Sequence, residues 1–374
     1  MRAYYFFYSF FYFIKLAFKR KHYNIIFYAP HHFNRGNNSE NIFFKDLLDL
    51  CKTHNLSFLY LEEPDVYSNQ KRSKIAIPFD FIYYLTVFFR KFMKSKISYI
   101  DDDKKIGGFM KKIFFKNITF DNYITISQSM LSFFNGVNSD AKRFDLQHGT
   151  IHAKKKSYLY NGIVSSNLKE NDVTLLLRGN AFKDILIKND TSNYFLDHIK
   201  VIGISNFNNV IPSKLNKNVL VSLQFTHDHS FDENKEIAEN LEIHIKKESS
   251  FHFYLKSHPR FNNEINLSRF LSLPNVSLFS EDLKDSFDKC SFHLTSYSSV
   301  TFEASLHGIP TCFLQLDPIK MSIFNTQYNY PFYNYLLSDL YNNYSFCSLK
   351  AQKWAKEFYQ PFCEASFLKS LKNA

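Results

Sequence analysis

The chain has 374 residues, more than one hydrophobic core usually accommodates, so its length predicts two domains. Hydrophobic residues make up 45% and charged residues 22%, as in a globular protein, and the formal net charge of +11 favours an anionic partner. No RNA- or DNA-binding signature accompanies that charge, so nucleic acid is not the expected partner. The five cysteines have neither paired nor metal-ligand spacing, which indicates reduced, buried thiols in a cytosolic protein rather than a disulfide framework.

The N-terminus combines aromatic and basic residues. Tyr4 to Phe13 is nearly all aromatic, and it is followed by Lys15, Lys19, Arg20 and Lys21. The apolar stretch is too short to span a bilayer and carries no small-residue cleavage site. An interfacial helix beside anionic lipid head groups fits this pattern, whereas a first helix packed against the domain core is the alternative. The segment Phe81 to Lys94 is open to the same two interpretations.

Short apolar runs then alternate with segments of helical periodicity. In the first half, the pattern predicts strands at Asn24–Tyr28, Leu56–Leu61, Tyr123–Ile126, Arg143–Leu146 and Val201–Gly203, and a helix at Asn41–His54. In the second half, it predicts strands at Asn218–Leu223, His252–Leu255, Asn275–Phe279, Ser291–Leu294 and Thr311–Leu314, and helices at Glu233–Lys247, Glu281–Lys289 and Ser298–His307. Alternation of strands and helices predicts parallel sheets covered on both faces.

The domain boundaries follow from a polar, Asn-rich stretch at 206–217, which is interpreted as a linker. Residues 1–205 then form a Rossmann-like domain on the acceptor side, and 218–345 form a domain that binds the nucleotide donor. The C-terminal helices in 346–374 are expected to pack back on the first domain. Two open α/β domains in tandem predict a ligand in the cleft between them, beyond the carboxyl ends of the strands.

Three short motifs fall at such strand ends. The third is the run from Thr295 to Ala304, where a strand gives way to a helix at Ser298 and Ser299. The first N–H groups of a helix have no intrahelical partner and suit a phosphate oxygen. Ser298 is expected to cap this helix, and Glu303 to share a face with Ser299 and bind ribose hydroxyls. Ser298, Ser299, Thr301 and Glu303 are therefore candidate donor-binding residues.

The second motif, Lys256 to Arg260, follows the predicted strand His252–Leu255. Pro259 restricts His258 to an extended conformation. A histidine held there can donate a hydrogen bond to a phosphate leaving group, while Lys256 and Arg260 add positive charge. A structural turn is the alternative for this short motif.

The first motif, Gln147 to Thr150, ends the strand Arg143–Leu146. His148 can take the proton from an acceptor hydroxyl, because the unperturbed histidine pKa lies near neutral pH. Gln147, Gly149 and Thr150 are the acceptor-side candidates beside it. His152 is a weaker competitor for the role of base.

The three motifs together resemble those of two known groups. The trio His-Gly-Thr, His-Pro and Thr-x-Tyr-Ser-Ser-Val is similar to that of CDP-glycerol glycerophosphotransferases, and His-Pro followed by Ser-Ser is similar to bacterial sialyltransferases and polysialyltransferases. The resemblance implies a GT-B fold, with two Rossmann-like domains whose parallel sheets face each other across a cleft. It also implies a cytidine-nucleotide donor whose phosphate is held by His258, Ser298 and Ser299.

The chain departs from both groups. The glycerophosphotransferases have Asp where this chain has Ser296, which argues against glycerol phosphate as the transferred group. The sialyltransferases have two acidic residues where this chain has Gln147 and His148, which argues against sialic acid and leaves His148 as the preferred base.

Other chemistries find less support in the sequence. Asp101 to Asp103 contain an Asp-x-Asp pattern that can hold a divalent metal, but a solvated loop is the expected structure, and neither a metal site nor a cofactor is predicted. No dinucleotide fingerprint, Walker loop or nucleophile elbow is present. A UDP-sugar 2-epimerase-like isomerase and a non-catalytic, membrane-associated scaffold of a polysaccharide assembly complex remain as alternatives.

The sequence therefore predicts a metal-independent glycosyltransferase that acts with inversion at the cytoplasmic face of the membrane. The expected donor is a CMP- or CDP-linked sugar, and the expected acceptor is a surface-polysaccharide or lipid-linked glycan. The expected further partner is the anionic inner-membrane surface.

Overall fold

The computed structural model describes residues 2–36, 39–65, 71–93, 98–205, 215–258, 260–314 and 318–372. The chain divides into two compact units. Unit 1 consists of 1–178, 183–205 and 362–374, and unit 2 consists of 179–182 and 206–361. Residues 206–214, most of the predicted linker, lie outside the described residues.

Unit 1 contains a seven-stranded sheet in the order β3-β2-β1-β4-β5-β8-β9. All of its strand pairs are parallel. Its strands are β1 (Lys21–Pro30), β2 (Phe58–Glu63), β3 (Ile77–Pro78), β4 (Ile118–Ile126), β5 (Lys142–Leu146), β8 (Val173–Leu177) and β9 (Ile199–Val201). A short antiparallel hairpin joins β6 (Leu159–Tyr160) and β7 (Ile163–Val164).

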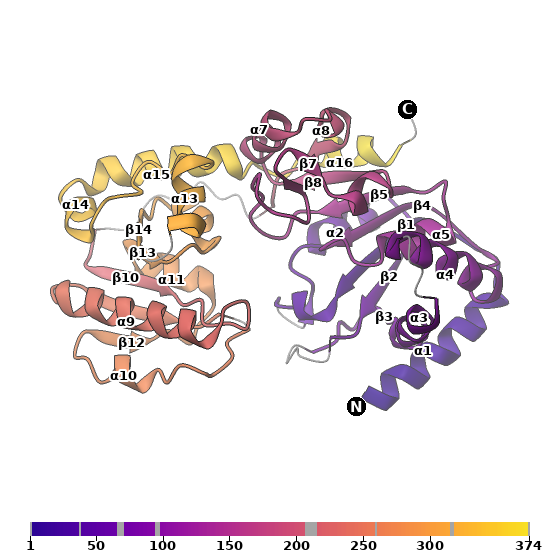
Figure 1. The fold of residues 1–374 in the computed structure, drawn as a ribbon, viewed down its shortest axis with the longest axis horizontal. Helices are drawn as coiled ribbons and strands as arrows, with labels where there is room; N and C mark the ends of the chain where they lie inside the picture. The colour runs from indigo at the N-terminus through magenta and orange to yellow at the C-terminus, as the bar shows by residue number, and fades with distance from the viewer. Residues whose placement is uncertain are drawn as a thin grey trace. The chain divides into compact units, whose positions relative to one another are not determined.

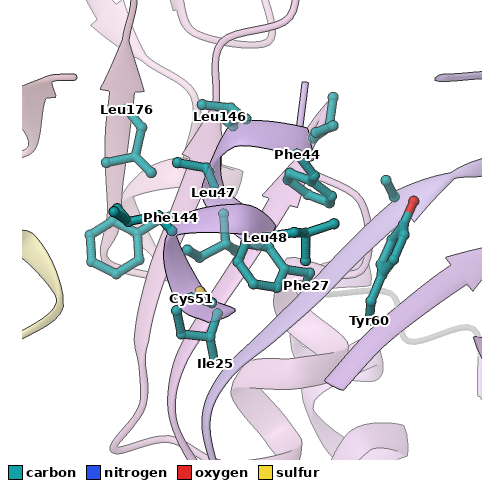
Figure 2. Packing of buried hydrophobic residues seen from close by; sticks show 14 of the residues in the cluster. Ile25, Phe27, Phe44, Leu47, Leu48, Cys51, Tyr60, Phe144, Leu146 and Leu176 are labelled. Atoms are coloured by element: carbon teal, nitrogen blue, oxygen red, sulfur yellow. The ribbon is translucent and has the colours of Figure 1, made fainter. Parts of the chain in front are cut away.

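Successive side chains of a strand point to opposite faces of the sheet. In unit 1 both of these faces are buried. Ile25 and Phe27 of β1 pack into a core cluster, as Figure 2 shows. This cluster contains Leu47 and Cys51 of α2 (Lys45–Thr53) and Phe44, which directly precedes that helix. Tyr28, which points to the other face, has its ring 5.2 Å from that of Phe79 and 5.5 Å from that of Phe134. Two buried faces account for the continuous hydrophobic runs of the central strands.

Helices cover both faces of the unit 1 sheet. Phe13 of α1 (Arg2–Ala17) contacts Phe79 and Phe115, and so lies on the same face as Tyr28. The helices α3 (Asp80–Phe92), α4 (Tyr99–Ile113) and α5 (Leu131–Val137) follow α1 in a connected series, visible in indigo and purple in Figure 1. The remaining helical segments of this half are η1 (His31–Phe33), α6 (Ser166–Lys169), α7 (Asn180–Asn189) and α8 (Tyr194–Asp197).

Unit 2 contains a five-stranded parallel sheet in the order β12-β11-β10-β13-β14. Its strands are β10 (Asn218–Ser222), β11 (His252–Lys256), β12 (Val276–Leu278), β13 (Phe292–Thr295) and β14 (Thr311–Phe313). Its helices are α9 (Phe231–Lys247), α10 (Ser268–Leu271), α11 (Leu283–Lys289), α12 (Val300–Leu306), α13 (Pro318–Thr326), α14 (Leu337–Asn342) and α15 (Tyr344–Phe358). The predicted class, α/β with two parallel Rossmann-like sheets, is confirmed.

The C-terminal segment is shared between the units, which differs from the expectation that all of 346–374 packs on the first domain. The helix α15 packs against α12 within unit 2, where the Trp354 and Phe302 rings stack 4.9 Å apart. Only the part that begins at Phe362, with α16 (Glu364–Leu371), belongs to unit 1. Phe367 of α16 is fully buried in the cluster around α2, so this helix completes the unit 1 core.

Candidate functional site

In unit 2 the two strands that precede the expected donor motifs, β11 and β13, lie on either side of β10. The chain passes from β10 to β11 and β12 on one side and places β13 and β14 on the other, so the strand order reverses between β10 and β13. Ligands of open α/β sheets bind at this kind of reversal, beyond the carboxyl ends of the strands. His258 follows β11, and Ser298 and Ser299 follow β13. The two motifs therefore flank the end of β10.

Gln224, which follows β10, organises this edge and was not singled out from the sequence. Its Oε1 accepts hydrogen bonds from the Tyr297 N–H (3.0 Å) and from the Thr295 hydroxyl (3.3 Å). The ring of His229 lies 5.5 Å from that of Tyr297 and bonds to the Gln224 carbonyl at 3.1 Å. Gln224 thereby fixes the turn that leads to Ser298. A glutamine after an apolar strand was the only signal available in the sequence.

The loop after β11 fixes the protonation pattern of His258. The backbone N–H of Arg260 donates to Nδ1 of His258 at 3.0 Å. A neutral imidazole whose Nδ1 accepts must carry its proton on Nε2. His258 therefore presents an N–H donor through Nε2, as a phosphate-binding role requires. Pro259 lies outside the described residues.

The two cations of this motif are bound to other groups. Both terminal nitrogens of Arg260 donate to the carboxylate of Asp228, and the first of these bonds is 3.2 Å long. Burial by itself raises the pKa of Asp228, but the hydrogen bonds and charge of Arg260, with a smaller contribution from Thr226, together lower it. Lys256 donates to the carbonyl of Glu281. In the unliganded chain both cations hold the loops around His258, and their direct role at a phosphate stays a prediction.

The serine-rich turn differs in detail from the predicted helix start. α12 begins at Val300 rather than Ser298. The hydroxyl of Ser298 accepts the Val300 N–H at 3.2 Å, so Ser298 does bind a backbone donor at the helix start. Ser299, which is half-buried, makes no capping bond with its side chain. Of the two serine hydroxyls, that of Ser299 is therefore not used to cap the helix.

Thr301 is corrected as a donor-binding candidate. Its side chain is fully buried and its Oγ1 has no hydrogen-bond partner among the described residues, so it contributes to the packing of α12. Glu303 is half-buried on the same helix and stays a candidate for ribose hydroxyls.

In unit 1 the strand order reverses between β1 and β4, and His148 lies beside this point. The segments that follow these strands are η1 and the turn Ser127–Met130. The ring of Phe33 in η1 is 5.3 Å from the ring of His148, and the Ser127 hydroxyl is 3.1 Å from Nε2 of His148. The geometry thus brings together residues that are far apart in the sequence, and neither Phe33 nor Ser127 was singled out from it.

The backbone of the β4–α5 turn is held in an unfavourable conformation. Ser127, Gln128 and Met130 have φ values of 60°, 56° and 55°. Non-glycine residues pay about 1 kcal/mol or more for this left-handed region, and such strain concentrates at functional sites. Asp145 of β5 holds the turn, because its carboxylate accepts the Gln128 N–H at 2.8 Å and the Tyr158 hydroxyl at 2.9 Å.

The side chain of Gln147 is buried and holds the backbone on either side of the site. It is 2% exposed, its Nε2 donates to the Gly149 carbonyl at 2.9 Å, and its Oε1 accepts the Arg178 N–H at 2.9 Å. Thr150 accepts a hydrogen bond from Lys155 through its carbonyl at 2.8 Å. A Cβ added to Gly149 would meet no atom within 4 Å, so space is open at this position.

His148 is neutral at physiological pH. Burial lowers its pKa to about 3, with further lowering by the charges of Lys155, Arg178, His32 and Arg35. The expectation that its pKa lies near neutral pH is therefore wrong for the unliganded protein. The same cations make the surroundings of His148 favourable for an anion. The competing His152 also has its pKa lowered, to about 4, by burial and by Lys155 and Lys154.

The aspartate run 101–103 does not form the expected solvated loop. It lies in α4, and Asp102 and Asp103 are each 7% exposed. Asp103 binds Arg90 through two hydrogen bonds of 2.7 Å, and both residues line a cavity of about 480 Å³. Among the residues that the structure describes, no group of three metal-ligating side chains is present.

No protein-family model matches this sequence, and no curated protein is similar enough to match it. Solved structures do match over nearly the whole chain. The glycosyltransferase of kitacinnamycin has a TM-score of 0.54 at 11% identity, with 93% of this chain and 98% of that chain covered. The UDP-GlcNAc 2-epimerase of Neisseria meningitidis, bound to UDP-GlcNAc, has a TM-score of 0.52 at 11% identity, with coverage of 93% and 99%.

A variant of the wall teichoic acid polymerase TagF is similar to 98% of this chain over 90% of its own length, with a TM-score of 0.50 at 14% identity. These similarities establish the fold, which is of the GT-B type. At such low identities the chemistry has to be argued from the residues of this chain.

Proposed function

We propose that the protein is a glycosyltransferase that moves a sugar from a nucleotide-activated donor to a glycan or lipid-linked acceptor. The GT-B fold is compatible with this activity and with a nucleotide-sugar substrate. A CMP- or CDP-linked donor is the preferred choice, because the motif resemblance to cytidine-nucleotide transferases includes His258, Ser298 and Ser299.

The observation that carries the proposal is the arrangement of donors at the carboxyl edge of the unit 2 sheet. His258 presents an Nε2–H on one side of β10, because its Nδ1 accepts the Arg260 N–H. On the other side, Gln224 holds the turn that presents Ser298 and Ser299. A fixed set of neutral donors can stabilise the charge that develops on a departing phosphate without reorganising during the reaction.

In the proposed reaction, an acceptor hydroxyl oxygen forms a bond to the anomeric carbon of the donor sugar. The bond from that carbon to the phosphate oxygen breaks, and its electron pair leaves with the nucleotide. His258 and Ser299 donate hydrogen bonds to this leaving group. The acceptor proton passes to His148, whose neutral form can accept it. Attack opposite the leaving group gives inversion.

The phosphate role is tested with two substitutions of one residue. His258→Asn keeps an acceptor for the Arg260 N–H but removes the distal donor, whereas His258→Gln retains an N–H group near the Nε2 position. We expect His258→Asn to lower turnover by about 100-fold and His258→Gln to retain part of it, because only the distal donor contacts the leaving group. Equal, near-normal activity of both variants would refute the role of His258.

Donor binding is tested by thermal shift with CMP, CDP, UDP, GDP and their sugar conjugates, with and without EDTA. A ligand at about 100 times its dissociation constant stabilises the folded state by roughly 2.7 kcal/mol. Selective stabilisation by a cytidine nucleotide, unchanged by EDTA and lost in His258→Asn, is the expected result.

Two alternatives predict different outcomes of the same screen. An epimerase-like isomerase predicts stabilisation by UDP-sugars and their conversion in the absence of any acceptor. A scaffold of a polysaccharide assembly complex predicts no response to any nucleotide.

A further inference from the structure

The first helix of the protein is apolar on two opposite faces. One face is buried against the core through Phe13 and Leu16. The opposite face carries Tyr4, Phe7, Tyr8, Phe11 and Ile14, and the turn after the helix continues it with Phe18. Phe7, Phe11 and Phe18 are 57%, 66% and 78% exposed. The solvent side of a surface helix is ordinarily polar, so this stripe requires a different environment from water.

The neighbouring helix α3 extends the exposed aromatic surface. Phe6 of α1 lies 5.6 Å from Phe81 and 6.4 Å from Tyr84, measured between ring centres, so the two helices adjoin. Phe88 and Phe92 of α3 are 52% and 72% exposed, and their rings are 4.7 Å apart. We call the exposed stripes of α1 and α3 the aromatic face; the two helices that carry it lie beside each other in Figure 1.

Positive charge borders the aromatic face. Lys15 lies in α1, and Lys19, Arg20 and Lys21 follow that helix directly; all four are exposed. Lys116, which follows α4, has its Nζ 5.7 Å from the centre of the Phe18 ring. The first acidic residue of the sequence is Glu40. An apolar aromatic stripe beside cations is complementary to lipid head groups that carry negative charge.

We propose that the aromatic face lies in the interface of a membrane that contains anionic lipids. The rings settle at the boundary between head groups and acyl chains, and the lysines and Arg20 contact the head groups. No helix in the described parts of the chain has both the length and the hydropathy needed to cross a bilayer, so contact is by a helix that lies in the interface plane. The proposal is independent of the donor and of the reaction.

Deletion of the first helix would not test this contact cleanly. Removing residues 1–21 would delete Phe13, which is fully buried, and the first residue of β1, so the truncated protein would lose part of its core. Exposed positions avoid this problem. We choose Phe7→Ser with Phe11→Ser as the test variant. The matched control is Phe346→Ser with Leu349→Ser on α15 of unit 2, where the side chains are 59% and 65% exposed.

The full-length protein is sedimented with vesicles of phosphatidylcholine alone or mixed with phosphatidylglycerol. We expect binding to the anionic vesicles, a loss of affinity of more than about tenfold in Phe7→Ser/Phe11→Ser, and no change in the control, because only the first pair of rings enters the lipid. Lys19→Glu with Arg20→Glu is expected to abolish the preference for anionic lipid, whereas Lys350→Glu with Lys353→Glu leaves it intact.

Three outcomes would overturn the proposal. One is that wild-type protein does not bind anionic vesicles. Another is that the aromatic double variant binds as well as wild type. The last is that the wild type self-associates in analytical ultracentrifugation and the double variant becomes monomeric without any difference in vesicle binding, which would make the aromatic face a contact between copies of the chain.

Discussion

At the scale of single residues, His148 combines a defined position with an unusual environment. Its Nε2 faces the Ser127 hydroxyl, and its Nδ1 is buried without a hydrogen-bond partner in the described part of the chain. Burial and the neighbouring cations lower its pKa to about 3. An anion bound beside those cations would offset their charge and raise the pKa of His148, which would make the residue a stronger base.

This environment predicts the pH dependence of the proposed reaction. The profile of kcat/KM reports groups of the free enzyme, and a pKa of about 3 keeps His148 neutral throughout the neutral range. We therefore expect no acid limb near pH 6.5 that depends on His148. Turnover of His148→Gln is expected to be at least about 100-fold lower than wild type, in line with loss of a general base. An acid limb near pH 6.5 that disappears in His148→Gln would contradict the proposed environment.

At the scale of elements, α4 and α5 approach each other closely enough to require glycine. A Cβ added to Gly107 would lie 2.0 Å from the carbonyl oxygen of Phe133, and one added to Gly136 would lie 2.0 Å from that of Lys104. Neither neighbour is a flexible side chain that could move aside. The contact holds α5, and with it the end of the strained turn that carries Ser127.

Gly107→Ala and Gly108→Ala provide a matched pair for this contact. The backbone clash is expected to make Gly107→Ala less stable by about 2 kcal/mol or more. The Cβ of Gly108→Ala would meet only the Gly136 carbonyl at 3.7 Å, so the better helix propensity of alanine should add up to about 1 kcal/mol. Urea unfolding measures both changes, and equal effects would show that the close approach of the helices does not limit stability.

The elements also show which features the sequence could predict. Most predicted strands are present with small shifts at their ends, because continuous apolar runs bounded by polar residues identify buried parallel strands. The helix α4 was missed because its acidic and basic residues from Asp101 to Lys105 suggested a loop. In the structure Ile100, Ile106 and Met110 form its buried side, and Arg90 compensates Asp103. An ion pair formed with a preceding helix has no signature in local periodicity.

The candidate site was predictable to the extent that it depends on strand ends. His148, His258 and the Ser298–Ser299 turn all follow strands, as expected. Their partners come from elsewhere: Asp228, which binds Arg260, is 32 residues away in the sequence. The contacts of Lys256 and Arg260 with other loops and the burial of Thr301 depend on such tertiary structure, which spacing alone does not contain.

At the scale of the whole molecule, low pH is expected to reduce the stability of the folded state through its buried histidines. His293 in unit 2 is fully buried between the hydroxyls of Ser222 and Thr311, each 2.9 Å from one ring nitrogen. Burial lowers its pKa to about 3, whereas an unfolded histidine titrates near 6.5. Below about pH 6.5 the unfolded state therefore binds a proton that the folded state excludes, and stability falls as the pH drops toward 3.

The single tryptophan makes this testable for one unit. Trp354 lies in α15 of unit 2, so its fluorescence follows the unfolding of that unit in urea. We expect the unfolding free energy to decrease between about pH 6.5 and pH 4, and to decrease less steeply in His293→Gln. His227→Gln, whose side chain is 78% exposed, is the control and should behave as wild type. Identical slopes for His293→Gln and wild type would exclude His293 as the responsible group.

The position of α16 has a consequence for synthesis on the ribosome. The core of unit 1 includes Phe367, so this unit cannot close before the last part of the present sequence has emerged from the exit tunnel. Unit 2 is formed by 179–182 and 206–361, and all of these residues emerge earlier. The unit that begins at the N-terminus is therefore expected to finish folding last. In a stalled nascent chain that carries residues 1–361 followed by a linker long enough to fill the exit tunnel, unit 2 should resist protease while unit 1 remains susceptible.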